Sequence, residues 1–210
     1  MRRVGMGRAL PSLMVRFLAR SNSLVAAAVV AACIAGAPAT SSAADSREIQ
    51  GYDVRVPNAA LNAGAARARV QSNHDTLRGV LVDYPHYSQI ITRFEKARVV
   101  GRVGQQTDVY LEVPILHGAT KIWAIVRFDA PKTEGADEVI RGRMVRGNVK
   151  RLDAAWRVRK IDETSADLAL ELLIVPDLPA PHSLILSEVR RAAARAVSGA
   201  RAEAERRSHH

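Results

Sequence analysis

The sequence predicts an α+β domain, an antiparallel sheet followed by one long helix at the C-terminal end. Successive stretches alternate apolar and polar residues and are separated by short turns, which is typical of an antiparallel meander. Residues 183–207 instead repeat apolar residues at helical spacing, with charged residues on the other sides. One face of such a sheet has to be covered by a second layer, and only this helix is long enough to cover it.

The first part of the domain predicts a strand followed by two short helical segments. Residues 46–58 alternate loosely and indicate an extended lead-in or an edge strand. Residues 65–71 alternate small apolar residues with polar ones, so we expect a strand there. A short helix is predicted over 74–82 and has to end before Pro85, since the residue before a proline avoids helical angles. A further helical turn is predicted over 87–91.

Six more strands are predicted along the middle of the chain. We expect them over 96–103, 107–116, 120–128, 138–146, 152–159 and 166–175. Residues 131–137, between the third and fourth of these, are predicted to form a polar loop. The alternation places one set of apolar side chains on the inward face: Ile122, Ala124, Val126, Phe128, Ile140, Met144, Leu152, Ala154, Trp156, Val158, Leu168, Leu170, Leu172 and Ile174.

The long C-terminal helix starts after prolines at 176, 179 and 181. Its apolar stripe consists of Ile185, Val189, Ala192, Ala196 and Ala200. The stripe thins from large residues to alanines toward the C-terminus. This pattern indicates either a cavity between helix and sheet or close packing of the helix through its small residues.

The first 44 residues differ from the rest and predict a secretory signal peptide. They contain five arginines and no acid, then the apolar run 24–36, then small residues up to Ala44. The apolar run is shorter than the roughly 20 residues that a spanning helix needs. We therefore expect a mature chain that starts near Ala44 or Asp45, with 45–64 as lead-in or edge strand and 65–207 as the folded domain.

Cys33 is the only cysteine, so the chain cannot form an internal disulfide. The segment Val30–Cys33 is similar to a bacterial lipobox, which would make Cys33 a lipid anchor. The alternative is that Cys33 is one more small apolar residue of the signal. In both cases we expect an exported protein, either periplasmic or tethered to a membrane through Cys33.

The net charge of the whole chain is +10, and removal of the five N-terminal arginines leaves +5. A mildly basic exported domain could meet an anionic membrane surface, whereas nucleic acid is excluded as a partner by the location. Arginines 141, 143, 157 and 159 fall on the outward face and predict a basic stripe. A chain of this length makes one domain with its own core, and we expect a monomer.

Three motifs together resemble a known family. Val82–Tyr87 reads VDYPHY, Gly147–Val149 precedes Ala155 and Trp156, and Val175–Pro179 reads VPDLP. Their order and spacing resemble the polyketide cyclase/dehydrase and coenzyme Q-binding family of the START-like (SRPBCC) superfamily. The resemblance implies a helix-grip fold, in which a curved antiparallel sheet wraps the C-terminal helix and encloses an apolar cavity. Ala155 departs from the glycine that the family often has there, and export departs from the location of its quinone and polyketide members.

Catalytic chemistry is not indicated by the residue pattern. The inward residues are almost wholly apolar, and the histidines at 74, 86, 117 and 182 lie at helix starts, turns or strand ends. None of them has metal-ligand spacing, and no acid/base pair emerges. We therefore expect no metal, no cofactor and no catalytic residue, and the sequence favours a binding protein over an enzyme.

Three functions fit the sequence. The first is an exported carrier for a hydrophobic ligand such as a lipid or quinone, the second a polyketide cyclase or dehydratase-like enzyme, and the third an interaction module without a ligand. Trp156 is either a flat apolar ligand contact or a core residue. The candidate ligand-binding residues are Trp156, Met144, Ala124, Val126, Leu170, Leu172, Ile185, Val189, Ala192 and Ala196.

Overall fold

The alternating stretches form one antiparallel sheet in the computed structural model, which describes residues 48–57, 59–115, 120–177 and 179–209. The predicted signal peptide 1–44, Cys33 and His117 lie outside these residues. Within the described part of the chain the strands are β1 Gln50–Val54, β2 Ala63–Val70, β3 Lys96–Val103, β4 Gln106–Ile115, β5 Thr120–Phe128, β6 Lys132–Glu134, β7 Asp137–Gly147, β8 Val149–Lys160 and β9 Ala166–Pro176.

Neighbouring strands pair in the order β1-β2-β9-β8-β7-β5-β4-β3, and the short β6 pairs with β7. The pairs between consecutive strands confirm the predicted meander, and β9 returns to lie between β8 and β2. β1 pairs only with β2, so the lead-in is an edge strand. The prediction that 131–137 is only a loop was wrong, because Lys132–Glu134 pairs with Asp137–Val139 to form a small hairpin.

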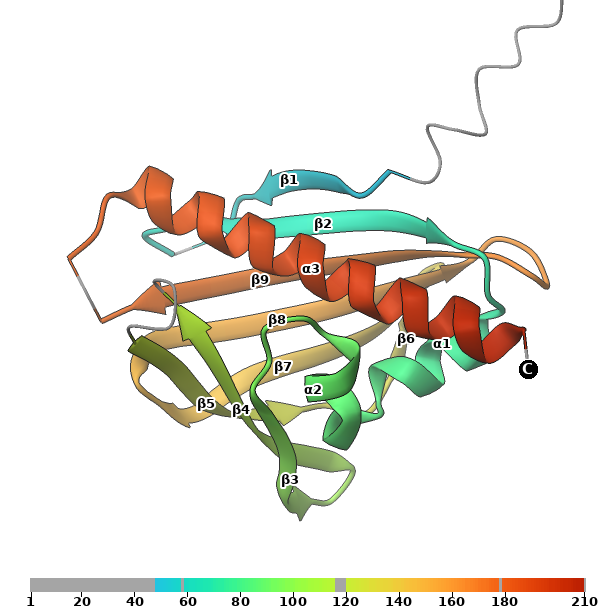
Figure 1. Cartoon of the computed structure of the whole chain (residues 1–210), viewed down its shortest axis with the longest axis horizontal. Coiled ribbons are helices and arrows are strands. Elements are labelled where there is room, and N and C mark those ends of the chain that lie inside the picture. Colours follow the sequence, from blue (N-terminus) through green and yellow to red (C-terminus); the bar gives the residue numbers. More distant parts are fainter. Residues whose placement is uncertain (1–47, 58, 116–119, 178, 210) are drawn as a thin grey trace, which may run out of the picture. The chain divides into compact units, whose positions relative to one another are not determined.

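In the part of the chain that the structure describes, four helical segments accompany the sheet: α1 His74–Leu81, η2 Tyr84–His86, α2 Tyr87–Ile90 and α3 His182–Ser208. Asn73 caps α1, since its side-chain oxygen accepts a hydrogen bond from the backbone N–H of Thr76 at 2.8 Å. α3 follows Pro181 and runs across the concave side of the sheet (Figure 1). This is the predicted helix-grip architecture. No helix of the described residues is long and apolar enough to cross a membrane.

α3 lies mainly over β2 and β9, and it packs there through small residues. Its buried side chains are Val189, Ala193, Ala196, Val197, Ala200 and Ala204. At Gly64 of β2 the approach is so close that an added Cβ would lie 2.5 Å from the backbone nitrogen of Arg190. The small residues of the helix therefore serve close packing along this edge of the sheet.

The second half of α3 also contacts α2. An added Cβ at Gly199 would overlap the carbonyl oxygen of Ile90, which shows that the two backbones touch there. Gly199 is therefore a second point at which the helix is held, on the side away from β2. Through these two contacts α3 is fixed to the sheet by its N-terminal half and to α2 by its C-terminal half.

Candidate functional site

The inner face of the sheet is packed tightly at one end and less completely at the other. Near the β2–α1 end, the inner side chains of Val70, Val158 and Leu168 are at most 1% exposed. α1, η2 and the C-terminal half of α3 cover this end (Figure 1). The aromatic rings of Tyr84 and Phe128 stack here with their centroids 4.6 Å apart. This end is a closed hydrophobic core.

At the opposite end several inner side chains are only half-buried, although they belong to the same cluster. They are Leu111, Ile122, Met144, Leu172 and Ile174. The pairing places them together, since Leu111 and Ile122 lie on the adjoining ends of β4 and β5, and Leu172 and Ile174 lie on β9 near the start of α3. We call this group the half-buried end. It presents inward-facing apolar surface that neither α3 nor α2 covers completely.

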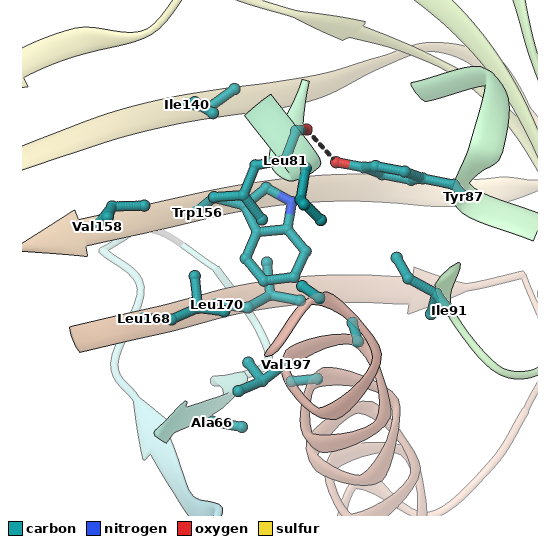
Figure 2. Packing of buried hydrophobic residues seen from close by; sticks show 14 of the residues in the cluster. Ala66, Leu81, Tyr87, Ile91, Ile140, Trp156, Val158, Leu168, Leu170 and Val197 are labelled. Atoms are coloured by element: carbon teal, nitrogen blue, oxygen red, sulfur yellow. Dashed lines mark hydrogen bonds between the residues drawn. The ribbon is translucent and has the colours of Figure 1, made fainter. Parts of the chain in front are cut away.

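Trp156 lies at the boundary between the two ends and is 3% exposed. Figure 2 shows its indole extending from β8 toward α3, with Leu170 and Val197 around it. The hydroxyl of Tyr87, beside the indole, donates a hydrogen bond to the carbonyl oxygen of Leu81 at 2.5 Å. Burial raises the pKa of Tyr87 well above its usual value, so the hydroxyl stays protonated.

Burial decides between the two interpretations of Trp156. The side chain is 3% exposed and belongs to the main hydrophobic cluster, together with residues of α1, α2 and α3. Trp156 is therefore a core residue that packs the helices against the sheet. Its ring can still contribute apolar surface to the floor of the half-buried end.

The predicted ligand-binding residues divide into four groups in the structure. Five are buried in the main core: Trp156, Ala124, Val126, Leu170 and Ala196. Val189 is buried too, but it belongs to neither hydrophobic cluster. Met144, Leu172 and Ala192 are half-buried. Ile185 contacts a separate small cluster built around Leu61, Ala63 and Leu173. The structure thus brings Met144 and Leu172 together at the half-buried end and places Ile185 apart from the main core.

The predicted stripe on α3 is shifted by one residue at its centre. Ala193 is fully buried, whereas Ala192 is half-buried and lies on the same side of the helix as Arg195 and Gly199. Because Gly199 contacts α2, this side of the helix faces the segment that follows α2. Ala192 therefore lies on the side of α3 that faces α2 and does not lie in the close contact with β2.

The outward face of the sheet carries the predicted basic stripe, but most of its charge is neutralised. Arg141 pairs with Glu134, Arg157 with Glu171 at 2.9 Å, and Arg159 with Asp137 at 2.7 Å, and Arg143 is exposed. A shallow hollow of about 340 Å³ lies on this face, lined by polar residues of β1, β2, β8 and β9 together with Asp137. The ion pairs weaken the prediction that the stripe attracts an anionic membrane.

Trp123 also lies on the outward face, between strands β4 and β7. Its ring stacks with Tyr110 at 6.1 Å, and the hydroxyl of Tyr110 donates to Glu112 at 2.6 Å. This bond, aided by Lys96 and Lys121, lowers the pKa of Glu112 to about 2. The cluster is far along the sheet from β1, because β1 pairs with β2 at the other edge.

An acid/base pair exists that the sequence analysis missed. The Nε2 atom of His74 lies 3.2 Å from the carboxylate of Glu138, and Arg78 lies 3.6 Å from the same carboxylate. The alternation that places Ile140 inward also places Glu138 inward, so the pattern contained this signal. Glu138 pairs with Val158, at the closed end of the sheet. The pair therefore lies away from the half-buried end and supports the N-terminus of α1.

The described residues contain no group of three or more histidine, cysteine or acidic side chains arranged to hold a metal ion. The features that distinguish the inner face are therefore its apolar lining, its unequal coverage, and the charges at its rim.

A curved antiparallel sheet that holds a long C-terminal helix defines the helix-grip class of folds. No protein-family model and no curated protein sequence matches this chain, whereas solved structures do. The chain is similar to the ZhuI aromatase/cyclase from Streptomyces sp. R1128, with a TM-score of 0.59, 18% identity, and coverage of 76% of this chain and 96% of that one.

Two further solved structures show the same arrangement. A STAR-related lipid transfer protein from Xanthomonas axonopodis has a TM-score of 0.62 and 15% identity, covering 73% of this chain and 92% of that one. Human STARD10 has a TM-score of 0.62 and 13% identity, and the match covers 74% of this chain and 69% of that one. The chain has the START-like helix-grip fold, as the resemblance of its motifs implied.

Proposed function

We propose that this chain is an exported carrier that binds a hydrophobic ligand between its sheet and α3. The observation that carries the proposal is the half-buried end, where Met144, Leu172 and their neighbours face inward yet remain partly exposed. An apolar ligand that covered these side chains would gain about 25 cal/mol for each Å² of apolar surface removed from water. The arginine-rich start of the chain, followed by an apolar run, supports export.

The solved structures support the same class of ligand. One similar protein is a lipid transfer protein, and another is an aromatase/cyclase. The aromatase/cyclase would favour an enzyme acting on a hydrophobic substrate. In this chain, however, His74 and Glu138 lie at the closed end, away from the apolar surface that a substrate would meet. The arrangement therefore favours binding and transport over acid/base chemistry.

A substitution on α3 tests the proposal. Ala192 is half-buried on the side of α3 that faces α2, and Ala192→Phe fills space there that the proposed ligand would occupy. We expect a neutral fluorescent acyl probe to bind the unchanged protein and to bind this variant several-fold more weakly, because the added ring competes for the same apolar surface. Fluorescence titration measures both affinities.

Ala202→Phe is the matched control, since Ala202 is exposed on the same helix. It should bind the probe like the unchanged protein. Absence of probe binding by the unchanged protein would contradict the carrier proposal. Equal loss in both variants would show that the site does not lie beside Ala192.

A further inference from the structure

Two arginines without acidic partners lie beside the half-buried end. Arg195 is on the same side of α3 as Ala192 and Gly199. Arg93 follows α2 and is two residues beyond Ile91, whose Cα lies against Gly199. The contact between α3 and α2 thus brings both side chains to the same edge of the inner face. Figure 1 shows the α2–β3 connection running close to α3.

Neither guanidinium forms a hydrogen bond or an ion pair with any residue that the structure describes. Burial lowers the pKa of Arg195, and the positive charge of nearby Arg93 lowers it further. The carboxylate of Glu188 acts on Arg195 as well, but it is bound by Arg191 at 2.5 Å. On the outer face, by contrast, Arg141, Arg157 and Arg159 are paired with acids. Because Glu188 is bound by Arg191, the repulsion between Arg93 and Arg195 is only partly offset, and a bound anion would relieve it.

The backbone at Arg93 is also strained. Residues 91–94 form a tight turn in which the N–H of Phe94 donates to the carbonyl oxygen of Ile91 at 3.2 Å. Arg93 has a φ of 78°, in the left-handed region that favours glycine. Strained residues of this kind are found where a side chain has a function that compensates for the cost. The turn directs an arginine to a position where a glycine would be easier to accommodate.

The surroundings indicate what kind of anion would bind. Phe94, the next residue, is half-buried against the main core, and Ile90 is half-buried on the other side of the turn. The two charges therefore stand at the border of an apolar surface and not on an open polar one. A ligand that reached both would have an anionic group at one end and a hydrophobic part at the other.

We propose that Arg93 and Arg195 bind the anionic head, a carboxylate or a phosphate, of an amphipathic ligand whose apolar part lies on the half-buried end. This proposal rests on the proposed carrier function and adds the chemical class of the ligand. A planar guanidinium is suited to both groups because it donates two parallel hydrogen bonds to neighbouring oxygens. The two arginines together would fix the orientation of the ligand, with its head at the rim.

Three fluorescent probes with the same acyl chain test the proposal: a carboxylic acid, its methyl ester and a phosphate monoester. The unchanged protein should bind both anions more tightly than the ester. In the double variant Arg93→Gln/Arg195→Gln the affinity for the anions should fall by about tenfold, since hydrogen bonds to charged groups have roughly this effect. Affinity for the ester should stay the same. A difference between the two anionic probes would tell which head group is preferred.

The variant should fold, because it removes two charges that repel each other and breaks no ion pair. Arg143→Gln on the outward face is the control, and it should keep the preference for anions. Equal affinity of the unchanged protein for acid and ester would overturn the proposal and leave the carrier function intact. An unchanged preference in the double variant would overturn it as well. If none of the three probes binds, the carrier function itself is contradicted.

Discussion

At the scale of single residues, contacts at glycines determine where α3 can lie. Gly199→Ala would push a methyl group into the carbonyl of Ile90, and neither backbone can yield easily. Overpacking of this kind costs about 1–3 kcal/mol, which exceeds the gain of about 0.5–1 kcal/mol that alanine brings in a helix. We expect Gly199→Ala to lower the free energy of unfolding by about 1–2 kcal/mol in urea titrations.

Gly79 of α1 provides a matched control for this prediction. It is also a helical glycine, but a Cβ added there meets nothing within 4 Å. Gly79→Ala should therefore raise the free energy of unfolding by about 0.5–1 kcal/mol. If both substitutions stabilised the protein equally, the result would contradict the close contact between α3 and α2 at Gly199.

The sequence predicted individual residues well on the strands and less well on α3. Alternation identified Trp156 and Leu170 as inward, because each step along a strand reverses the face. On the helix, residues 192–194 are all alanine, so polarity gives no contrast by which to set the rotation. The stripe was therefore assigned to Ala192, where the structure buries Ala193. The Arg93–Arg195 pair could not be predicted, since only the contact between α2 and α3 brings the two together.

At the scale of elements, the turn between β8 and β9 depends on one carboxylate. Asp162 accepts hydrogen bonds from the hydroxyl of Ser165 at 2.7 Å and from the backbone N–H of Thr164 at 2.8 Å. These bonds lower the pKa of Asp162 to about 2, from 3.8. A carboxylate whose pKa is lowered by folding stabilises the fold at pH values above its pKa in the unfolded chain. This contribution is lost as the pH falls from about 4 toward 2.

The turn therefore predicts a pH dependence. Between pH 4 and pH 2 the melting temperature of Asp162→Asn should fall less steeply than that of the unchanged protein. Ser165→Ala removes the strongest donor and should reduce the steepness by part of that difference. Calorimetric melting curves across this range measure it. Identical slopes in all three proteins would mean that Asp162 does not stabilise the folded turn.

The elements themselves were largely predictable, with one informative exception. Each long strand contains enough alternating residues to be recognised. α3 was recognisable because it is long and because three prolines precede it and mark where it starts. β6 has only three residues, too few for alternation to show. Its pairing depends on a turn at Gly135, which has a φ of 64°, and on the neighbouring strand β7. Such a hairpin is determined by tertiary contacts more than by local sequence.

At the scale of the whole molecule, the order of elements and three short motifs predicted the START-like fold. They could not predict how completely α3 covers the sheet, because this depends on the contacts at Gly64 and Gly199. Those contacts close one end of the inner face and leave Met144, Leu172 and their neighbours half-buried at the other. The proposed function depends on this unequal coverage.

Nuclear magnetic resonance of methyl groups tests the central claim most directly, that a hydrophobic ligand binds at the half-buried end. On titration with a medium-chain fatty alcohol, the methyl signals of Ile122, Met144 and Leu172 should shift, because the ligand covers these side chains. Those of Val158 and Leu168, at the closed end, should stay in place, since each is fully buried already. Shifts confined to residues of the outward face, or no shifts at saturating ligand, would contradict the account.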